Sequence, residues 1–357
     1  MAPASIPIDE APRTGARSIA ARTRPTTPGR PTASSVARAI DASSAAATVT
    51  ADLTAAEPGQ SDAATGLPGR IAFLGFGLIG GSIARALRAI GAPSRLVAWT
   101  PSGRGPADGL ALGILDEAAQ TPAQALTGAG LVILAGPPLA VLASVTDRTG
   151  PLRTALASQA TITDVASTKG RIVEAAGAAA LPFVGGHPMA GREASGVKAS
   201  MADLFVDRPW VIVPSSWATV RDTTRVEMLA TAVGARPLSM APGEHDRAVA
   251  AVSHLPLVLA ASLVETVLDG RVGGEAARRL AATGWADMTR LAHGDAEMGA
   301  GILATNAAAV VERLREVRDA LDAWIDALDQ IDRTKDSAAL RKRLEAARAS
   351  IAAEPRA

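Results

Sequence analysis

A glycine-rich turn between a short apolar strand and a helical segment constrains this chain more than any other feature. The turn lies in RIAFLGFGLIGGSIARALRAIGA, residues 70–92, where the apolar run Ile71–Leu74 precedes the pattern G-x-G-x-x-G at Gly75, Gly77 and Gly80. Beyond the glycines, apolar residues recur at the three- and four-residue spacing of a helix. The segment therefore predicts a strand, a tight turn and a helix in immediate succession.

Each glycine has a physical role in that unit. Gly75 makes the tight turn, Gly77 lets the backbone come close to a pyrophosphate, and Gly80 lets the helix pack against the strand. A pyrophosphate then lies against the N–H groups at the N-terminus of the helix. The alternative is a glycine turn that is tight for packing alone. The predicted dinucleotide site consists of Gly75, Phe76, Gly77, Leu78, Ile79 and Gly80.

The second strand bears on which dinucleotide binds. In this fold an Asp or Glu about 20 residues beyond the glycines hydrogen-bonds the adenosine ribose, and its charge repels the 2′-phosphate of NADP. The segment RLVAWT ends instead in Thr100, followed by Ser102 and Arg104, and no carboxylate occurs until Asp108. Because hydroxyl groups and a guanidinium can bind a phosphate, the sequence predicts NADP in preference to NAD. If Arg104 points into solvent, the pocket accepts either cofactor.

Further apolar runs follow at regular intervals and are mostly separated by Ala-rich helical stretches. They are LVILAG (131–136), TITDV (161–165), PFVGG (182–186) and WVIVP (210–214). Continuous apolar strands that alternate with helices predict a largely parallel sheet covered on both faces. Ligands bind such sheets beyond the carboxyl ends of the strands, so Ser167 and Lys169, which follow TITDV, are candidates for a site.

His187 is the strongest candidate at this edge of the sheet. It stands in GGHPMAG, directly after the run PFVGG. Pro188 biases His187 toward an extended backbone, and Gly185 and Gly186 let neighbouring backbone or a ligand come close. The motif therefore predicts an imidazole held at the ligand edge of the sheet. The alternative is a structural histidine that only binds a loop carbonyl.

The chain beyond residue 240 is helical. The segment EHDRAVAAVSHLPLVLAASLVETVLDG, residues 244–270, contains Pro256, which should kink the helix beside His254. His245 and His254 are nine residues apart and would point to nearly opposite sides of one continuous α-helix. We therefore expect at most one of the two histidines to face the nucleotide domain.

Residues 307–350 form a long Ala-rich segment with a single apolar stripe, which predicts an amphipathic helix. The longest apolar run, Ala248–Val264, is interrupted by polar residues and a proline, and is expected to be too short to span a membrane. A buried helix fits this run better. The stripe consists of Leu314, Val317, Leu321, Trp324, Ile325 and Leu328.

Composition excludes several classes of function. The formal charge of +1 gives no electrostatic footprint for nucleic acid or a membrane surface, and the lack of cysteine excludes disulfides and cysteine-based zinc sites.

Residues 1–69 contain no aromatic residue, which predicts a disordered leader. Residues 11–40 contain six Arg and no acid, yet an unstructured leader or a mis-assigned start is favoured over a transit peptide. Without a secretory signal, a cytoplasmic location is expected.

Five motifs occur in an order that is found in one enzyme family: GFGLIGGS, TDVASTKG, GGHPMAG, EHDRAVAAVSHLP and GWADMTRLA. Over about residues 70–330 the chain resembles prephenate and arogenate dehydrogenases, the NAD(P)-dependent enzymes of tyrosine biosynthesis. The resemblance implies an α/β Rossmann-type nucleotide-binding domain, residues 70–243. It implies that an all-α dimerisation and substrate domain follows, residues 244–350, and that the protein is a homodimer.

The resemblance also assigns site residues. His187 would be the catalytic base, Ser167 its partner at the substrate hydroxyl, and His254 and Arg290 would bind the substrate. The reaction would convert prephenate to 4-hydroxyphenylpyruvate, or arogenate to tyrosine, with hydride transfer to NAD(P)+ and loss of CO2. Histidine suits proton removal near neutral pH, and aromatisation drives the loss of CO2, so no metal is needed. Arg290 offers a planar fork to a carboxylate, although an ion pair with Asp287 is an equal alternative.

Three positions depart from the family pattern. Leu257 stands where a second histidine is common, Gly299 where a tryptophan is common, and Arg192 where a small polar residue is common. Two alternatives share the glycine turn. Another two-domain dehydrogenase, of the β-hydroxyacid or imine-reductase type, has no evident use for the motifs GGHPMAG and SHLP. In a non-catalytic, nucleotide-sensing dimer the histidines would be structural.

Overall fold

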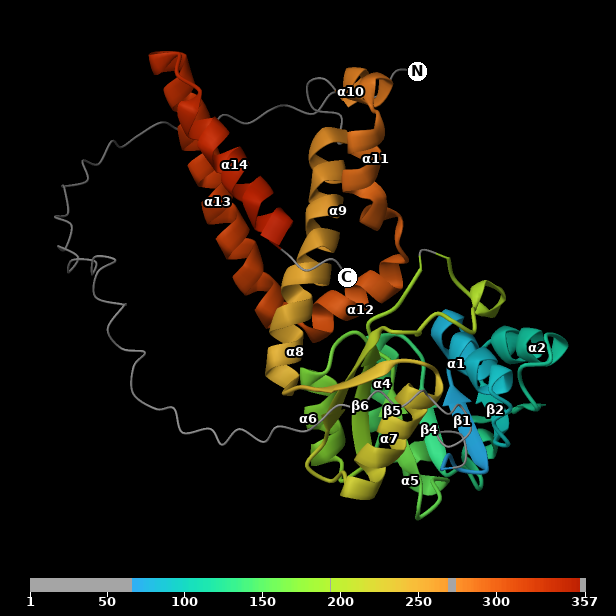
Figure 1. Ribbon diagram of the computed structural model, residues 1–357. Coiled ribbons are helices and arrows are strands. Elements are labelled where there is room, and N and C mark those ends of the chain that lie inside the picture. The colour runs from blue at the N-terminus through green and yellow to red at the C-terminus, as the bar shows by residue number, and fades with distance from the viewer. Residues whose placement is uncertain (1–65, 193, 269–273, 354–357) are drawn as a thin grey trace, which may run out of the picture. The chain divides into compact units, whose positions relative to one another are not determined.

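The computed structural model (Figure 1) describes residues 66–192, 194–268 and 274–353. Most of the expected leader, residues 1–65, and its arginine-rich part lie outside the described residues. The boundary expected at residue 69 is too late, because Leu67 is 8% exposed and belongs to a core cluster. Pro68 also joins the fold, since its carbonyl accepts a hydrogen bond from Ser94 Oγ at 2.7 Å.

The described strands form one eight-stranded sheet in the order β3-β2-β1-β4-β5-β6-β7-β8. All neighbouring pairs are parallel except β6 and β7, which confirms the largely parallel sheet. The sequence did not predict β3, which has two residues, or β8, whose four residues are all exposed at the sheet edge. The strands are β1 (Arg70–Leu74), β2 (Arg95–Trp99), β3 (Glu117–Ala118), β4 (Leu131–Leu134), β5 (Thr161–Asp164), β6 (Phe183–Pro188), β7 (Pro209–Pro214) and β8 (Arg236–Ser239).

Helices cover both faces of the sheet (Figure 1), and the alternation of side chains along β1 shows how. Ile71 and Phe73 pack in the cluster that α1 and α7 join, whereas Ala72 packs in the cluster that α3, α4, α5 and α6 join. The helices of this part are α1 (Leu78–Ala89), α2 (Arg104–Ala111), α3 (Pro122–Leu126), α4 (Pro138–Thr146), α5 (Pro151–Thr154), α6 (Gly170–Ala178) and α7 (Val220–Ala232), with a 3-10 turn η1 (Val197–Ala199).

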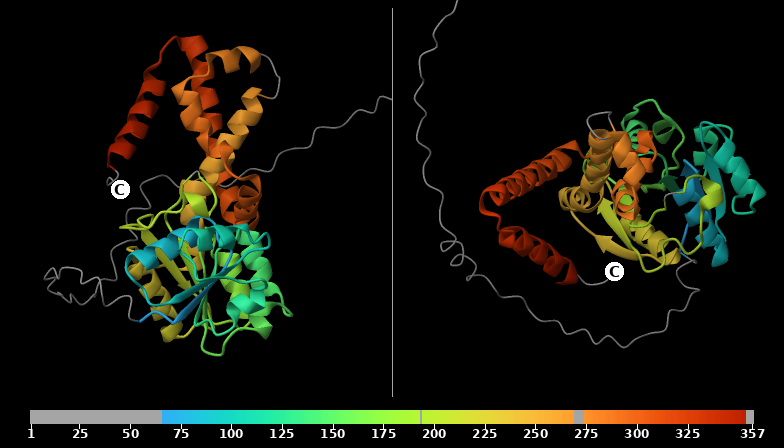
Figure 2. Two further views of the ribbon diagram at one scale, coloured as in Figure 1. Left: turned by 90° about the vertical axis from the view of Figure 1, so that its right-hand side faces the viewer. Right: turned by 90° about the horizontal axis from the view of Figure 1, so that it is seen from above.

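The second part of the chain is helical, as expected. It consists of α8 (Pro242–Val249), a π-helical turn η2 (Ala250–His254), α9 (Leu255–Leu268), α10 (Gly274–Leu280), α11 (Thr283–Thr289), a 3-10 turn η3 (Arg290–His293), α12 (Ala296–Thr305), α13 (Ala307–Thr334) and α14 (Ala338–Ala353). The single helix expected over residues 307–350 is in fact two, because Lys335 adopts a left-handed backbone with φ of 58° and ends α13. The helix α14 folds back from the end of α13, and the two helices diverge as a V (Figure 2). The Arg343 guanidinium of α14 lies 4.4 Å from the centre of the Trp324 ring of α13.

The π-helical turn overturns the expectation that at most one of two histidines faces the nucleotide domain. Pro256 cannot donate to the helix ladder, and the turn η2 ends at His254, two residues before it. Because a π turn rotates the chain less per residue than an α-helix, the side chains of His245 and His254 are not opposed. Both side chains are buried, and the charge of each lowers the pKa of His187.

Among the described residues, one helix is long and apolar enough to cross a membrane, judged by length and composition alone. It runs over Pro242–Leu268 and has 27 residues, so the expectation that this segment is too short is wrong. Its N-terminal part, however, contains three buried polar side chains, His245, Asp246 and His254, all of which hydrogen-bond within the protein. The expectation of a buried helix is nevertheless wrong, because only 22% of the most apolar window of this helix is buried.

Candidate active site

A cavity of about 930 Å³ lies at the carboxyl edge of the sheet, above the glycine turn. Gly75 has φ of +98°, and a Cβ there would lie 2.5 Å from the carbonyl carbon of Ala135, so only glycine fits. A Cβ on Gly77 would meet no protein atom within 4 Å, which leaves this backbone open to a ligand. The roles predicted for these two glycines agree with that geometry.

The rest of the glycine turn divides into two groups. Gly75, Phe76 and Gly77 line the cavity, whereas Leu78, Ile79 and Gly80 do not. These last three residues are the first turn of α1, which carries no side-chain cap at its N-terminus. Their N–H groups are therefore available to an anion at the helix end, as a pyrophosphate requires.

The residues expected at the adenosine end all line the same cavity. Thr100 ends β2, and its Oγ1 is buried without a hydrogen-bond partner in the described part of the chain. Ser102 and Arg104 lie beside it and are exposed. Asp108 also lines the cavity, but its Oδ1 pairs with Lys198 Nζ at 3.3 Å. The open glycine backbone, the uncapped helix and the unpartnered hydroxyl fit a nicotinamide dinucleotide.

His187 lies near the end of β6 and is fixed by the strand next to it. Asp164, the last residue of β5, accepts a hydrogen bond at Oδ1 from the backbone N–H of Gly186 at 3.0 Å. A Cβ on Gly186 would lie 2.6 Å from the carbonyl oxygen of Asp164, and one on Gly185 would lie 3.0 Å from Lys169 Cδ. The two glycines before His187 therefore allow the close packing predicted from the motif.

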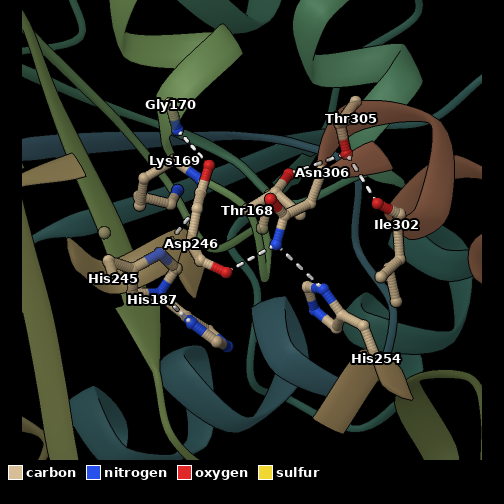
Figure 3. Close-up of polar contacts among 12 residues, drawn as sticks. Thr168, Lys169, Gly170, His187, His245, Asp246, His254, Ile302, Thr305 and Asn306 are labelled. Atoms are coloured by element: carbon tan, nitrogen blue, oxygen red, sulfur yellow. Dashed lines mark hydrogen bonds and ion pairs between the residues drawn. The ribbon is translucent and has the colours of Figure 1, made fainter. Parts of the chain in front are cut away.

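A chain of hydrogen bonds runs away from His187 into the helical part (Figure 3). Nδ1 of His187 lies 2.8 Å from Nε2 of His245, and Nδ1 of His245 lies 2.8 Å from Oδ1 of Asp246. The backbone N–H groups of Lys169 and Gly170 each donate to the Asp246 carboxylate at 2.8 Å. Nε2 of His187 makes no hydrogen bond to any described residue, so one ring nitrogen is anchored and the other is available.

Burial keeps His187 neutral. Loss of hydration lowers the pKa of His187 well below 6.5, and the charges of His245, Lys169 and His254 lower it further. Burial alone would raise the pKa of Asp246, but the hydrogen bonds from His245 and the two backbone N–H groups outweigh burial and hold that pKa below 3.8. At neutral pH the chain therefore ends in a carboxylate and begins in a neutral imidazole.

A buried ion pair lies next to this chain of hydrogen bonds. Lys169 Nζ binds Asp164 Oδ2, and both side chains are fully buried. Burial raises the pKa of the Asp164 carboxyl and lowers the pKa of the Lys169 ammonium, while the attraction between the two charges opposes both shifts. Lys169 was expected only to lie in the loop after β5. Its backbone and side chain instead contact two different parts of the site.

His254 is held by Asn306, the residue between α12 and α13. The Asn306 Nδ2 amide lies 3.2 Å from Nδ1 of His254 and donates to the carbonyl of Asp246 at 2.7 Å. Burial lowers the pKa of His254 to about 4, the charge of Asp246 raises it and that of His245 lowers it. A neutral ring that accepts at Nδ1 carries its proton at Nε2. That Nε2 is buried and has no partner among the described residues.

Comparison with known proteins places these residues in a family. The family model described as "Prephenate dehydrogenase, nucleotide-binding domain" matches residues 83–237, and the one described as "Prephenate dehydrogenase, dimerization domain" matches residues 241–345. The chain belongs to the prephenate dehydrogenase family. This family is one of NAD-dependent oxidoreductases, and its architecture is a nucleotide-binding domain followed by a helical dimerisation domain.

Individual relatives agree with this assignment. The chain is 32% identical over 265 residues to a prephenate dehydrogenase of Bacillus subtilis, a match that covers 73% of this chain and 68% of the relative. A structure of prephenate dehydrogenase from A. aeolicus, in complex with hydroxyphenyl propionate and NAD+, is 25% identical with a TM-score of 0.71. The match covers 79% of this chain and 98% of the A. aeolicus chain. Synechocystis arogenate dehydrogenase is 28% identical with a TM-score of 0.64, and the match covers 79% and 99% of the two chains.

Two of the residues that the family resemblance suggested lie outside the hydrogen-bonded cluster around His187. Ser167 makes no hydrogen bond to His187, and its Oγ is buried without a partner in the described part of the chain. Arg290 begins η3 and is exposed. The described residues contain no group of three or more His, Cys, Asp or Glu side chains that could hold a metal ion.

Sequence reasoning missed three residues that shape this site of the prephenate dehydrogenase fold. His245 and Asp246 stand in the motif EHDRAVAAVSHLP, from which only His254 was assigned a role. The adjacent His–Asp pair in the first turns of a helix was the available signal. Asn306 gave no signal, because its role depends on the junction of α12 and α13 in three dimensions.

Proposed function

We propose that this protein catalyses the oxidative decarboxylation of prephenate to 4-hydroxyphenylpyruvate, or of arogenate to tyrosine, with NADP+ used in preference to NAD+. One observation carries the proposal within the family. His187 presents Nε2, which makes no hydrogen bond to the described residues, at the sheet edge that also holds the dinucleotide cavity. A neutral imidazole at that place is suited to take a proton while hydride leaves the same substrate.

His187 acts on the substrate hydroxyl. As the O–H proton moves to His187 Nε2, the carbon that bears the hydroxyl becomes a carbonyl and loses hydride. The bound nicotinamide supplies the hydride acceptor. The ring carboxylate then leaves as CO2, and its bonding pair completes the aromatic ring, whose phenolate oxygen is reprotonated. A positioned base of this kind contributes about 10² to 10⁴ in rate.

Three further residues complete the proposed substrate site. The Nε2–H of His254 is a buried donor without a partner among the described residues, which suits it to an anionic oxygen of the substrate. Ser167 Oγ, also buried and unpartnered there, suits the substrate hydroxyl. Arg290 is exposed and would pair with a substrate carboxylate through its planar fork.

The preference for NADP+ rests on the end of β2. Thr100, Ser102 and Arg104 offer two hydroxyls and a guanidinium, and Thr100 stands where an Asp or Glu is usual in this fold. Asp108 faces the same cavity, but Lys198 offsets its charge at 3.3 Å. A 2′-phosphate beside Asp108 therefore meets a carboxylate whose charge is offset by a lysine.

We also propose the division of the chain at residues 243 and 244, a homodimer through the helical domain, and a cytoplasmic location. The dimer is supported by the dimerisation-domain match and by Leu321, Ile325 and Leu328 on α13, each more than half exposed. The cytoplasmic location is supported only by the biosynthetic relatives.

One experiment separates this proposal from the alternatives. Purified protein is given prephenate or arogenate with NAD+ or NADP+, and the formation of reduced nicotinamide and of CO2 is followed. We expect turnover of at least one substrate. Turnover of β-hydroxyacids or imines instead, or tight cofactor binding without turnover, would overturn the proposal in favour of the other two classes.

Variants then test the residues. His187→Asn should keep cofactor affinity and lower kcat by about 10² or more. Ser167→Ala should lower kcat less. An unchanged kcat in a folded His187→Asn protein contradicts its role as the base, and a covalent substrate adduct on Ser167 contradicts its role as a hydrogen-bonding residue.

A further inference from the structure

We propose that His245 and Asp246 are positioning residues that fix the tautomer of His187 and share the positive charge that forms on it during the reaction. The proposal rests on the function proposed above, since it concerns the same base. It is carried by the continuous hydrogen-bonded chain from His187 through His245 to Asp246. Both partners are connected to Nε2 of His187 through the His187 ring, so each acts through His187.

The direction of the hydrogen bonds follows from Asp246. Its carboxylate takes N–H donors from the backbone of Lys169 and Gly170, and an ionised carboxylate has no proton to donate. Nδ1 of His245 must therefore carry the proton in its bond to Asp246. In neutral His245 this leaves a lone pair on Nε2, which can only accept from Nδ1–H of His187. The lone pair of neutral His187 then lies on Nε2, the nitrogen that faces no described partner.

The opposite direction of these hydrogen bonds would remove the lone pair from Nε2 of His187, which could then no longer act as a base. If His245 carried protons on both nitrogens, its Nε2–H would donate to Nδ1 of His187, whose own proton would then sit on Nε2. A second proton on this pair would lie near the buried Lys169 ammonium, whose charge already lowers the pKa of His187. His245 is fully buried, Lys169 precedes α6 with a fully buried ammonium, and His254 lies on the π turn. Asp164 on β5 is neutralised by Lys169, so Asp246 is the one carboxylate that is left to balance a cation here.

The hydrogen-bonded chain takes up the proton that the substrate loses, and only protons move along it. The substrate proton binds Nε2 of His187, and the Nδ1 proton of His187 shifts toward Nε2 of His245. The charge on His245 then lies next to the Asp246 carboxylate at 2.8 Å. The fixed carboxylate stabilises the imidazolium where it forms, as a preorganised charge does in a low-dielectric site. When the proton returns to the phenolate oxygen, both shifts reverse.

Asp246→Asn is the sharpest test. An asparagine amide can donate to Nδ1 of His245 and so reverse every hydrogen bond in the chain, which puts the proton of His187 on Nε2. We expect kcat to fall by about 10² to 10⁴, with cofactor affinity within a factor of about three. Glu244→Gln is the matched control, because Glu244 is an exposed acid two residues earlier on the same helix.

His245→Gln separates positioning from charge sharing and guards against a misfolded Asp246→Asn protein. The Gln oxygen can still accept from Nδ1–H of His187 but cannot take up a proton. We expect kcat to fall by about tenfold, less than for Asp246→Asn, with KM little changed. His293→Gln is the control, because His293 is the exposed histidine of the chain and lies on η3.

Nitrogen NMR of the histidine rings gives a readout that does not depend on turnover. We expect a proton on Nδ1 and a lone pair on Nε2 of His187 in the wild-type protein, and the reverse in Asp246→Asn. Protonated Nε2 in neutral wild-type His187, or full kcat in folded Asp246→Asn, would overturn the relay. If the tautomer is found but prephenate and arogenate are not turned over, the proposed function fails while the assignment of the His187 tautomer to His245 and Asp246 stands.

Discussion

Lys169 and Asp164 form a fully buried ion pair directly behind the strand that carries His187. Each residue also contacts a different end of the site through a second group. Asp164 Oδ1 accepts from the backbone of Gly186, next to His187, and the backbone N–H of Lys169 donates to Asp246. The pair therefore connects His187 to Asp246, the two ends of the proposed relay.

Loss of one partner should be costly. Lys169→Met leaves a buried carboxylate without its cation, and breaking a buried pair in this way costs about 3–5 kcal/mol. The double variant Asp164→Asn/Lys169→Met should cost less than the sum of the two single variants, because it leaves no unpaired charge. Urea unfolding measures both. Lys198→Met is the control: its pair with Asp108 is exposed, with Lys198 at 77%, and should contribute at most about 1 kcal/mol.

The pH profile of kcat/KM should have its acid limb well below pH 6.5. His187 must be neutral to take a proton, and burial lowers its pKa well below 6.5. Activity is therefore present above that lowered pKa and is lost as the pH falls through it. Initial rates at saturating cofactor measure the limb. An apparent pKa at or above 6.5 that disappears in His187→Asn would show that the ring is not buried in the working enzyme.

Stability should fall on acidification through a second histidine. The pKa of His254 is lowered from 6.5 to about 4, so its contribution is fully present above pH 6.5 and is lost as the pH falls to about 4. The unfolded chain takes up the proton first, which favours unfolding by on the order of 3 kcal/mol at the acid end. His254→Gln should flatten this dependence, as measured by urea unfolding across the range. His293→Gln, at an exposed site, should leave it unchanged.

The sequence predicted the nucleotide-binding half well because its signals are local. The run Ile71–Leu74, the glycine turn and GGHPMAG each specify their own backbone, and β1, α1 and β6 follow them closely. The helical half carried fewer local constraints. A π turn changes the relative direction of His245 and His254, and nothing in a 3.6-residue period announces it. Short β3 and exposed β8 lack the apolar run that marks a strand.

The N-terminal boundary of the fold can be tested at Leu67. This side chain is 8% exposed and packs in the core cluster of β1, so Leu67→Ala should cost about 2 kcal/mol or more. A chain that starts at Leu67 should keep the wild-type melting temperature, whereas one that starts at Arg70 should melt lower. Equal melting temperatures for these two shortened chains would place the boundary at residue 69 after all.

We expect cofactor choice to depend on Thr100, whose buried Oγ1 has no hydrogen-bond partner among the described residues. A carboxylate at this position accepts from the adenosine ribose and repels a 2′-phosphate, whereas threonine does neither. Thr100→Asp should therefore shift the ratio of kcat/KM for NAD+ over NADP+ by about tenfold or more toward NAD+. Thr127→Asp, at an exposed threonine directly after α3, is the control for an added charge and should leave the ratio unchanged.

Arg104→Gln distinguishes a pocket in which Arg104 binds the 2′-phosphate from one in which Arg104 lies in solvent. If Arg104 binds the phosphate, this variant loses NADP+ efficiency alone; if Arg104 lies in solvent, both cofactors are used equally well before and after the change. A wild-type enzyme that is strictly selective for NAD+ would contradict the role assigned to the end of β2.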